Sequence, residues 1–204
     1  MLMSSLGRVL CSVLYIALLV IPGLVYAADA KDNLHKITLS IKNLQGDFTQ
    51  FEYDERGRPL RVLQGKFKMT NKLQLWWQVA PPYAQTVISN GTHTMIYDDD
   101  LQQLIVRALD TENLPPFFFM ASNPQLLDQM TIDQPDPEDP TFFLSDSNTD
   151  IFVRFNRRLP VEISWENELN QKIMINFSRV TKNRRLAKKI FDFKPPPGTS
   201  IITD

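Results

Sequence analysis

Side chains that commonly perform catalysis or bind metals are few in this sequence and lie far apart. The two histidines, His35 and His93, have no partner at the spacing that a metal site needs, so we interpret both as solvated side chains. The run Asp98-Asp99-Asp100 lacks the alternating oxygen ligands and the glycine of a calcium loop, so it predicts a tight turn between strands. We therefore expect no metal site.

Motifs for nucleophilic catalysis and phosphate binding are missing as well. The chain has only 7 glycines, with no glycine-rich phosphate loop among them, and no serine lies in a nucleophile-elbow motif. The single cysteine, Cys11, lies in an apolar run near the N-terminus. We expect neither an enzyme nor a bound cofactor.

Large apolar side chains, in contrast, are abundant and unusually placed. Trp76 and Trp77 are adjacent on a predicted strand, and because strand side chains alternate, the two rings must lie on opposite faces. The rings of Phe117, Phe118 and Phe119 cannot share one side of a helix, so at least one faces solvent or a cavity. An ordinary core is one interpretation. The other is a cavity for an apolar guest, in which each buried CH₂ contributes about 0.8 kcal/mol.

The N-terminal residues predict export. A short segment with one basic residue, Arg8, precedes an apolar run, and Val25-Tyr26-Ala27 places small residues where a signal peptidase cleaves. We expect a signal peptide over residues 1–27 and a single domain over residues 28–204. A cut after Ala30 and a retained N-terminal membrane anchor are the alternatives.

Composition restricts the remaining function classes. The formal net charge of −1 argues against a nucleic-acid binder. No apolar run of about 20 residues follows the predicted signal, so we expect a soluble mature chain. Loss of Cys11 with the signal would leave an exported domain without disulfides.

The apolar pattern predicts a mainly β protein with helices, an α+β fold. Leu34, Ile37, Ile41 and Leu44 form one stripe and predict a helix over residues 33–44. The segment 114–130 predicts one or two short helices, and the last residues predict a stiff tail. Period-two alternation predicts strands over residues 47–55, 60–70, 73–79, 84–90, 93–98, 101–108, 141–146, 150–156, 160–167, 169–180 and 188–193.

A sheet of about ten antiparallel strands must curl or split to avoid long flat edges. The two helical segments are too short to cover both of its faces. We therefore expect an unclosed antiparallel β-barrel, a strongly curved sheet, with an α-helical lid over an apolar cavity.

Several segments, taken in order, resemble the periplasmic outer-membrane lipoprotein carrier family, LolA. "LWW" (75–77) lies where the family has Phe-x-Trp. "VISNGTHTMIYDDDLQQLIV" (87–106) resembles the hairpin pattern that follows in the family. The other matching segments are "GDFTQ" (46–50), "QGKFKM" (64–69), "PPFFFMASN" (115–123) and "FKPPPGTSI" (193–201).

The resemblance implies a monomeric carrier in the periplasm. It would take acylated lipoproteins from an inner-membrane ABC transporter, bind their acyl chains, and pass them to the outer-membrane receptor LolB or an equivalent. The implied lid residues are Pro116, Phe117, Phe118, Phe119 and Met120. The expected lipid-binding cavity wall is Phe48, Phe67, Met69, Leu75, Trp77, Ile88, Met95, Val106, Ile163 and Trp165.

Two positions depart from the family pattern. Asn71 and Lys72 stand where the family has Arg-Pro, and that arginine is thought to hold the lid shut in the empty carrier. Lys72 offers a point charge but not a planar fork, so we expect weaker closure. Leu75 is smaller than the family's phenylalanine.

Two other functions fit the same residues. The chain could be a lipid-sensing or lipoprotein-sensing regulatory domain of the same fold, although such proteins usually add a second domain or an anchor. An enzyme acting on a lipid would need a catalytic group that the sequence does not show. The basic segment 182–189 is interpreted as a solvated turn in preference to a docking site for an acidic partner.

Overall fold

The computed structural model describes residues 22–109, 127–147 and 149–203. One α-helix, α1 (Pro22–Leu39), precedes the strands. The strands are β1 (Asn43–Tyr53), β2 (Pro59–Thr70), β3 (Gln74–Val79), β4 (Gln85–Asn90), β5 (His93–Asp98), β6 (Gln103–Ala108), β7 (Thr131–Asp133), β8 (Thr141–Ser145), β9 (Asp150–Asn156), β10 (Leu159–Glu166), β11 (Lys172–Lys182) and β12 (Ser200–Thr203).

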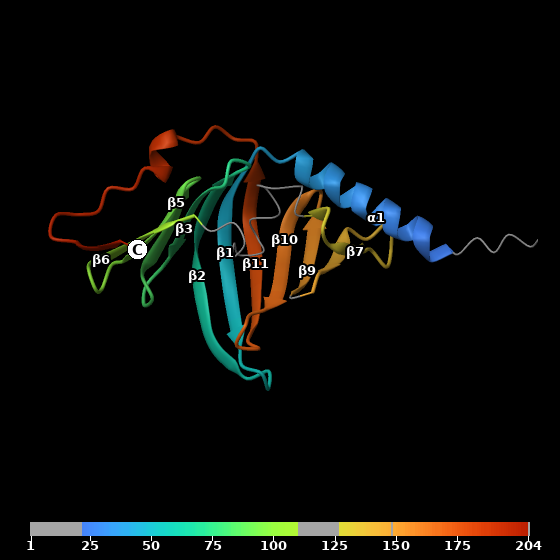
Figure 1. The fold of residues 1–204 in the computed structure, drawn as a ribbon, viewed down its shortest axis with the longest axis horizontal. Helices are drawn as coiled ribbons and strands as arrows, with labels where there is room; N and C mark the ends of the chain where they lie inside the picture. Colours follow the sequence, from blue (N-terminus) through green and yellow to red (C-terminus); the bar gives the residue numbers. More distant parts are fainter. Residues whose placement is uncertain (1–21, 110–126, 148, 204) are drawn as a thin grey trace, which may run out of the picture.

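All of these strands belong to one sheet, as the sequence predicted for a mainly β fold. The sheet has 12 strands in the order β12-β6-β5-β4-β3-β2-β1-β11-β10-β9-β8-β7, so it is curved and unclosed, with β12 and β7 at its two edges. Figure 1 shows α1 lying along the β7 end of the sheet, while the segment after β11 runs over to the β6 end. Helix α1 and the segment after β11 thus lie at different parts of the sheet.

The helix is displaced from its predicted position. It begins at Pro22, because proline at a first helical position loses no hydrogen bond, and it ends at Leu39 rather than at Leu44. Ser40 Oγ donates to the Ile37 carbonyl at 2.7 Å, which satisfies an orphan carbonyl at the helix end. Leu44 instead pairs with Met69 in the β1–β2 ladder.

Three other differences from the prediction lie at the strand level. Residues Lys188–Phe191 form a 3₁₀ helix, η2, where a strand was predicted. The short edge strands β7 and β12 were not predicted; β7 pairs with the next strand along the chain, β8, whereas β12 depends on pairing with a distant one. The tail, for example, adds β12 in parallel to β6, with Ile202 beside Ile105.

A tight turn at Asn90-Gly91 joins β4 to β5. Gly91 takes φ +97°, which favours glycine, but Asn90 stays in the strand. The Asn90 side-chain oxygen accepts bonds from the backbone N–H of Thr92 at 2.9 Å and of His93 at 2.8 Å. The asparagine therefore stabilises the turn through its side chain.

The larger core lies between α1 and one face of the sheet, which we call the inner face. Leu34, Ile37 and Ile41 are the buried side chains at the C-terminal half of α1 and just after it, and they pack in this core. In the described residues no helix is both long enough and apolar enough to cross a membrane.

Candidate functional site

Four aromatic rings meet at the centre of the inner face. Phe48 of β1 stacks on Trp77 of β3, with ring centroids 3.7 Å apart and an interplanar angle of 22°. Phe67 of β2 lies 5.9 Å from Trp77 and 5.1 Å from Phe177 of β11. All four are buried. The four neighbouring strands thus form an aromatic floor, which we call the aromatic group.

Two glycines allow these rings to lie flat on the sheet. Phe48 is paired across the ladder with Gly65, and Phe67 with Gly46. A Cβ at Gly65 would be 2.5 Å from the Phe48 ring and 1.9 Å from the Gln78 carbonyl oxygen. A Cβ at Gly46 would be 3.2 Å from the Phe67 ring. The rings occupy the space that side chains at these positions would take.

Further predicted wall residues lie on the same face as the aromatic group. Met69 and Leu75 are paired between β2 and β3, two residues along from the pair of Phe67 and Trp77. On β10, Ile163 pairs with Ile175, two residues from the paired position of Trp165. Of the ten predicted wall residues, seven therefore share the inner face.

The remaining three predicted wall residues lie on the opposite, outer face. Directly opposed residues of antiparallel strands share a face. Trp77 is opposite Val87, whereas Ile88 is opposite Trp76. Met95 pairs with both Ile88 and Val106, so these three follow Trp76 to the outer face. They therefore do not share a face with the aromatic group, which the sequence did not reveal because β4, β5 and β6 carry apolar residues on both faces.

The residues that continue the inner face across β4, β5 and β6 were missed. Val87 pairs with Ile96, and Ile96 with Ile105. All three are half-buried, in contrast to the buried Trp77. Adjacent apolar residues such as Val87 and Ile88 do signal a strand with two apolar faces, but they do not say which residue lies on the inner face.

The outer face of β3 to β6 has a small core of its own. Ile88, Met95, Tyr97 and Leu104 are buried there, with Trp76, Val106 and Phe193 packed against them. The Phe193 ring lies 5.2 Å from that of Tyr97, and Lys68 Nζ is 4.9 Å from the centroid of Trp76. Trp76 is therefore a residue of the outer face, where the C-terminal segment covers the sheet.

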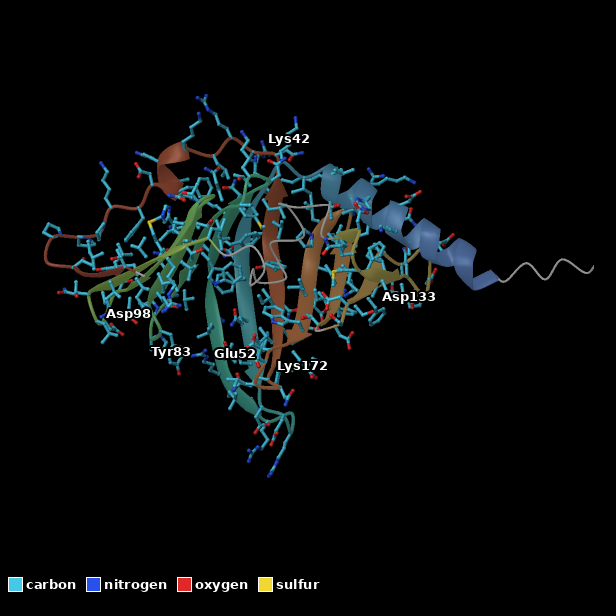
Figure 2. All side chains as sticks on the ribbon, in the orientation of Figure 1. Lys42, Glu52, Tyr83, Asp98, Asp133 and Lys172 are labelled. Carbon is cyan, nitrogen blue, oxygen red and sulfur yellow. The ribbon has the colours of Figure 1, made fainter. Side chains whose placement is uncertain are left out.

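Polar groups mark the end of the inner face where β1 turns into β2. Glu52 is buried, and Arg61 donates to one of its carboxylate oxygens at 2.6 Å while Gln50 donates to the other at 2.7 Å. Beside Arg61 lies an open pocket of about 250 Å³, whose lining includes Tyr83 and Asp98. Figure 2 shows Glu52, Tyr83 and Asp98 at this same end of the strands.

Comparison with known proteins identifies the family to which this chain belongs. The model of the family described as outer membrane lipoprotein carrier protein LolA matches residues 39–194, which is more than half of the chain. The chain belongs to the LolA family. An outer-membrane lipoprotein carrier protein of Alcanivorax borkumensis is 27% identical over 202 residues, covering 93% of this chain and 97% of that relative.

Solved structures agree on the fold of this LolA-family chain. A conserved protein of Thermus thermophilus superposes with a TM-score of 0.53 at 10% identity, covering 87% of this chain and 99% of the other. A LolA superfamily protein of Nitrosomonas europaea gives 0.50 at 11% identity, covering 81% and 97%. At such identities the likeness concerns the fold alone.

The two positions that depart from the LolA pattern lie in the turn between β2 and β3. Asn71 and Lys72 are both exposed, and the Asn71 backbone N–H donates to the Lys42 carbonyl at 3.0 Å. The predicted lid residues 116–120 lie outside the described residues. A contact between the lid and Asn71 or Lys72 therefore stays a prediction.

His35 and Asp98, which were considered above as possible metal ligands, have structural partners. His35 Nε2 lies 3.3 Å from an Asp128 carboxylate oxygen, which Lys31 also approaches at 3.2 Å. The hydrogen bond from Lys31 lowers the pKa of Asp128 below its ordinary value. Asp98 accepts from the backbone N–H groups of Asp100 and Leu101, as expected for a turn. Within residues 22–109, 127–147 and 149–203, no three histidine or acidic residues gather as a metal site would require.

Proposed function

We propose that this LolA-family protein is a periplasmic carrier that binds the acyl chains of lipoproteins on the inner face of its sheet. The observation that carries the proposal is the continuous apolar inner face around the aromatic group of Phe48, Phe67, Trp77 and Phe177. The side chains on this face are aromatic and aliphatic, so the face would bind a hydrocarbon chain non-covalently, through packing and the exclusion of water.

The grip on an acyl chain would be reversible. Each CH₂ removed from water contributes about 0.8 kcal/mol, so a long chain is held firmly while each contact stays weak. Val87, Ile96 and Ile105 are half-buried and extend the same face towards β12. An acyl chain that enters along these strands would meet a continuous apolar path.

The partners follow from the family to which the chain belongs. The protein would receive acylated lipoproteins from an inner-membrane ABC transporter and deliver them to LolB or an equivalent receptor, acting as a monomer without a cofactor. The neutral Asn71 in place of the family arginine would weaken the closure of the empty carrier.

The proposal is tested by placing a carboxylate on the inner face. Purified processed protein is added to inner-membrane vesicles that contain the transporter and a labelled lipoprotein, and soluble complex is measured in the supernatant. Trp77→Glu and Val87→Glu should each lower the yield of complex at least tenfold, since the carboxylate would be buried against hydrocarbon. Val87 is the milder site because its side chain is half-buried.

Val62→Glu is the matched control for the valine variant. Val62 lies on the outer face of β2, because its neighbour Leu63 is buried on the inner one, and its side chain is 48% exposed. Circular dichroism melts report whether each variant folds. Equal complex formation by folded Val87→Glu and Val62→Glu would contradict the proposed site. Lipid binding without release of lipoprotein would instead favour the sensing domain.

A further inference from the structure

Positive charge is concentrated at one end of the strands. We define the basic edge as six exposed residues: Lys42, Lys72, Arg184, Arg185, Lys188 and Lys189. They come from three places in the chain, namely the α1–β1 connection, the β2–β3 turn and the segment that follows β11. Figure 2 shows Lys42 at this end, opposite to Glu52, Asp98 and Lys172.

Hydrogen bonds through Asn183 hold the basic edge together. Its side-chain oxygen accepts from the Lys42 backbone N–H at 2.8 Å, and its side-chain nitrogen donates to the Ser40 carbonyl at 2.9 Å. Its own backbone N–H donates to the Asn43 carbonyl at 2.9 Å. These hydrogen bonds therefore fix the start of the basic segment against the α1–β1 connection.

None of the ion pairs between described residues neutralises a charge of the basic edge. Within the part of the chain that the structure describes, the ion pairs of Lys31, Arg56, Arg58, Arg61, Arg154 and Arg179 leave these six residues out. The one acid between Lys182 and Lys194 is Asp192. Acidic turns such as 98–100 lie at the opposite end of the strands, and the acidic loop 136–139 follows the edge strand β7.

An exposed apolar side chain adjoins these charges. Leu39, the last residue of α1, is 66% exposed and directly precedes Ser40, the residue bonded to Asn183. Lys182 Nζ lies 3.3 Å from Ser40 Oγ, which places a further cation there. Basic residues around an exposed leucine are typical of surfaces that rest on a membrane interface.

We propose that the basic edge docks this protein on the surface of an anionic phospholipid bilayer. Long flexible side chains spread over three segments fit a field of mobile phosphate headgroups, each basic residue adding to the attraction. A stable protein interface would more commonly show buried aromatic anchors at its centre. This surface is distinct from the inner face, so a bound acyl chain would not compete with docking.

The test uses vesicles without any lipoprotein. The processed protein, purified from a periplasmic extract, is co-sedimented with phosphatidylglycerol-rich vesicles and with phosphatidylcholine vesicles at low and high salt. We expect binding to the anionic vesicles alone, weakened by salt. The double variant Lys188→Glu and Lys189→Glu should bind at least tenfold more weakly, and Leu39→Ser a few-fold more weakly.

The matched control reverses two cations at the opposite end, Arg56→Glu and Lys172→Glu, and lowers the net charge by the same amount. It should retain most of the binding. Three results would overturn the proposal: equal binding to both vesicle types, equal loss in the control variant, or unchanged binding when Lys188 and Lys189 are reversed. Absence of vesicle binding by the unmodified protein would also overturn it and would direct attention to an acidic protein partner.

Discussion

At the scale of single residues, the two adjacent tryptophans show that both faces of the sheet carry a packed core. Trp77 stacks on Phe48 at the inner face, while Trp76 packs with Phe193 and Ile88 on the outer face. Alternation along a strand requires this separation, and it was predicted from sequence. What alternation could not predict is the stack itself, which depends on Gly65 leaving room for the Phe48 ring.

Gly65→Ala should therefore damage the aromatic group. The added Cβ would lie 1.9 Å from the Gln78 carbonyl oxygen, so strand β2 and the Phe48 ring must both shift. We expect the free energy of unfolding to fall by about 3 kcal/mol in urea denaturation. Gly57→Ala is the control, with nothing within 4 Å but φ +74°, and should cost about 1 kcal/mol. Equal costs for the two variants would refute the crowding argument.

At the scale of elements, strands β4, β5 and β6 are apolar on both faces. The inner face uses Val87, Ile96 and Ile105, and the outer face uses Ile88 and Met95. The outer face is covered by the segment that contains η2 and Phe193. Residues 188–193 were predicted to form a strand, but they contribute η2 and then the Phe193 ring, which packs on this second core.

Phe193→Ala should loosen this half of the sheet selectively. Loss of a half-buried ring against Tyr97 should lower the free energy of unfolding by about 2 kcal/mol. Hydrogen exchange should become faster in β5 and β6 than in β9 and β10. Phe143→Ala serves as the control, because Phe143 is 46% exposed on β8. Uniformly faster exchange over all strands would argue against a separate outer core.

The attachment of α1 to the segment after the predicted lid should depend on pH. Lys31 holds the pKa of Asp128 below its ordinary value of 3.8, so the ionised carboxylate is favoured in the folded protein. This stabilisation is fully present above pH 3.8 and is lost as the pH falls through the lowered pKa.

Exchange protection factors of the α1 amides should consequently fall in strong acid. Asp128→Asn should lower them already at neutral pH and should remove their dependence on acid. A variant with unchanged protection at neutral pH would show that the ion pair does not hold the helix.

At the scale of the whole molecule, the sheet is a single open layer, with α1 packed on it at one end and the segment after β11 at the other. α1 packs on the inner core, and the C-terminal segment packs on the outer one and then adds β12 to the edge. The described helix contains both candidate cleavage sites, after Ala27 and after Ala30. The structure thus gives a physical reason to choose between them.

We predict that the processed protein begins at Ala28. Ala30 is 1% exposed within the inner core, and Lys31 pairs with Asp128. A cut after Ala30 would remove a core residue and place a new charged terminus beside this pair. Mass spectrometry of the exported protein measures the start directly. A mature chain that starts at Lys31, or that retains residues 1–27, would contradict the prediction.

Sequence patterns were enough to predict most strands to within a few residues, the open mainly β architecture and the opposite placement of Trp76 and Trp77. These follow from local alternation and turn residues, which act within a few positions along the chain. Tertiary contacts were needed to show that Val87 rather than Ile88 lies opposite Trp77, that residues 188–191 form η2 instead of a strand, and that the tail adds β12. The first depends on the register of β4 against β3, for which a strand with two apolar faces carries no local signal, and the last depends on pairing with the distant β6.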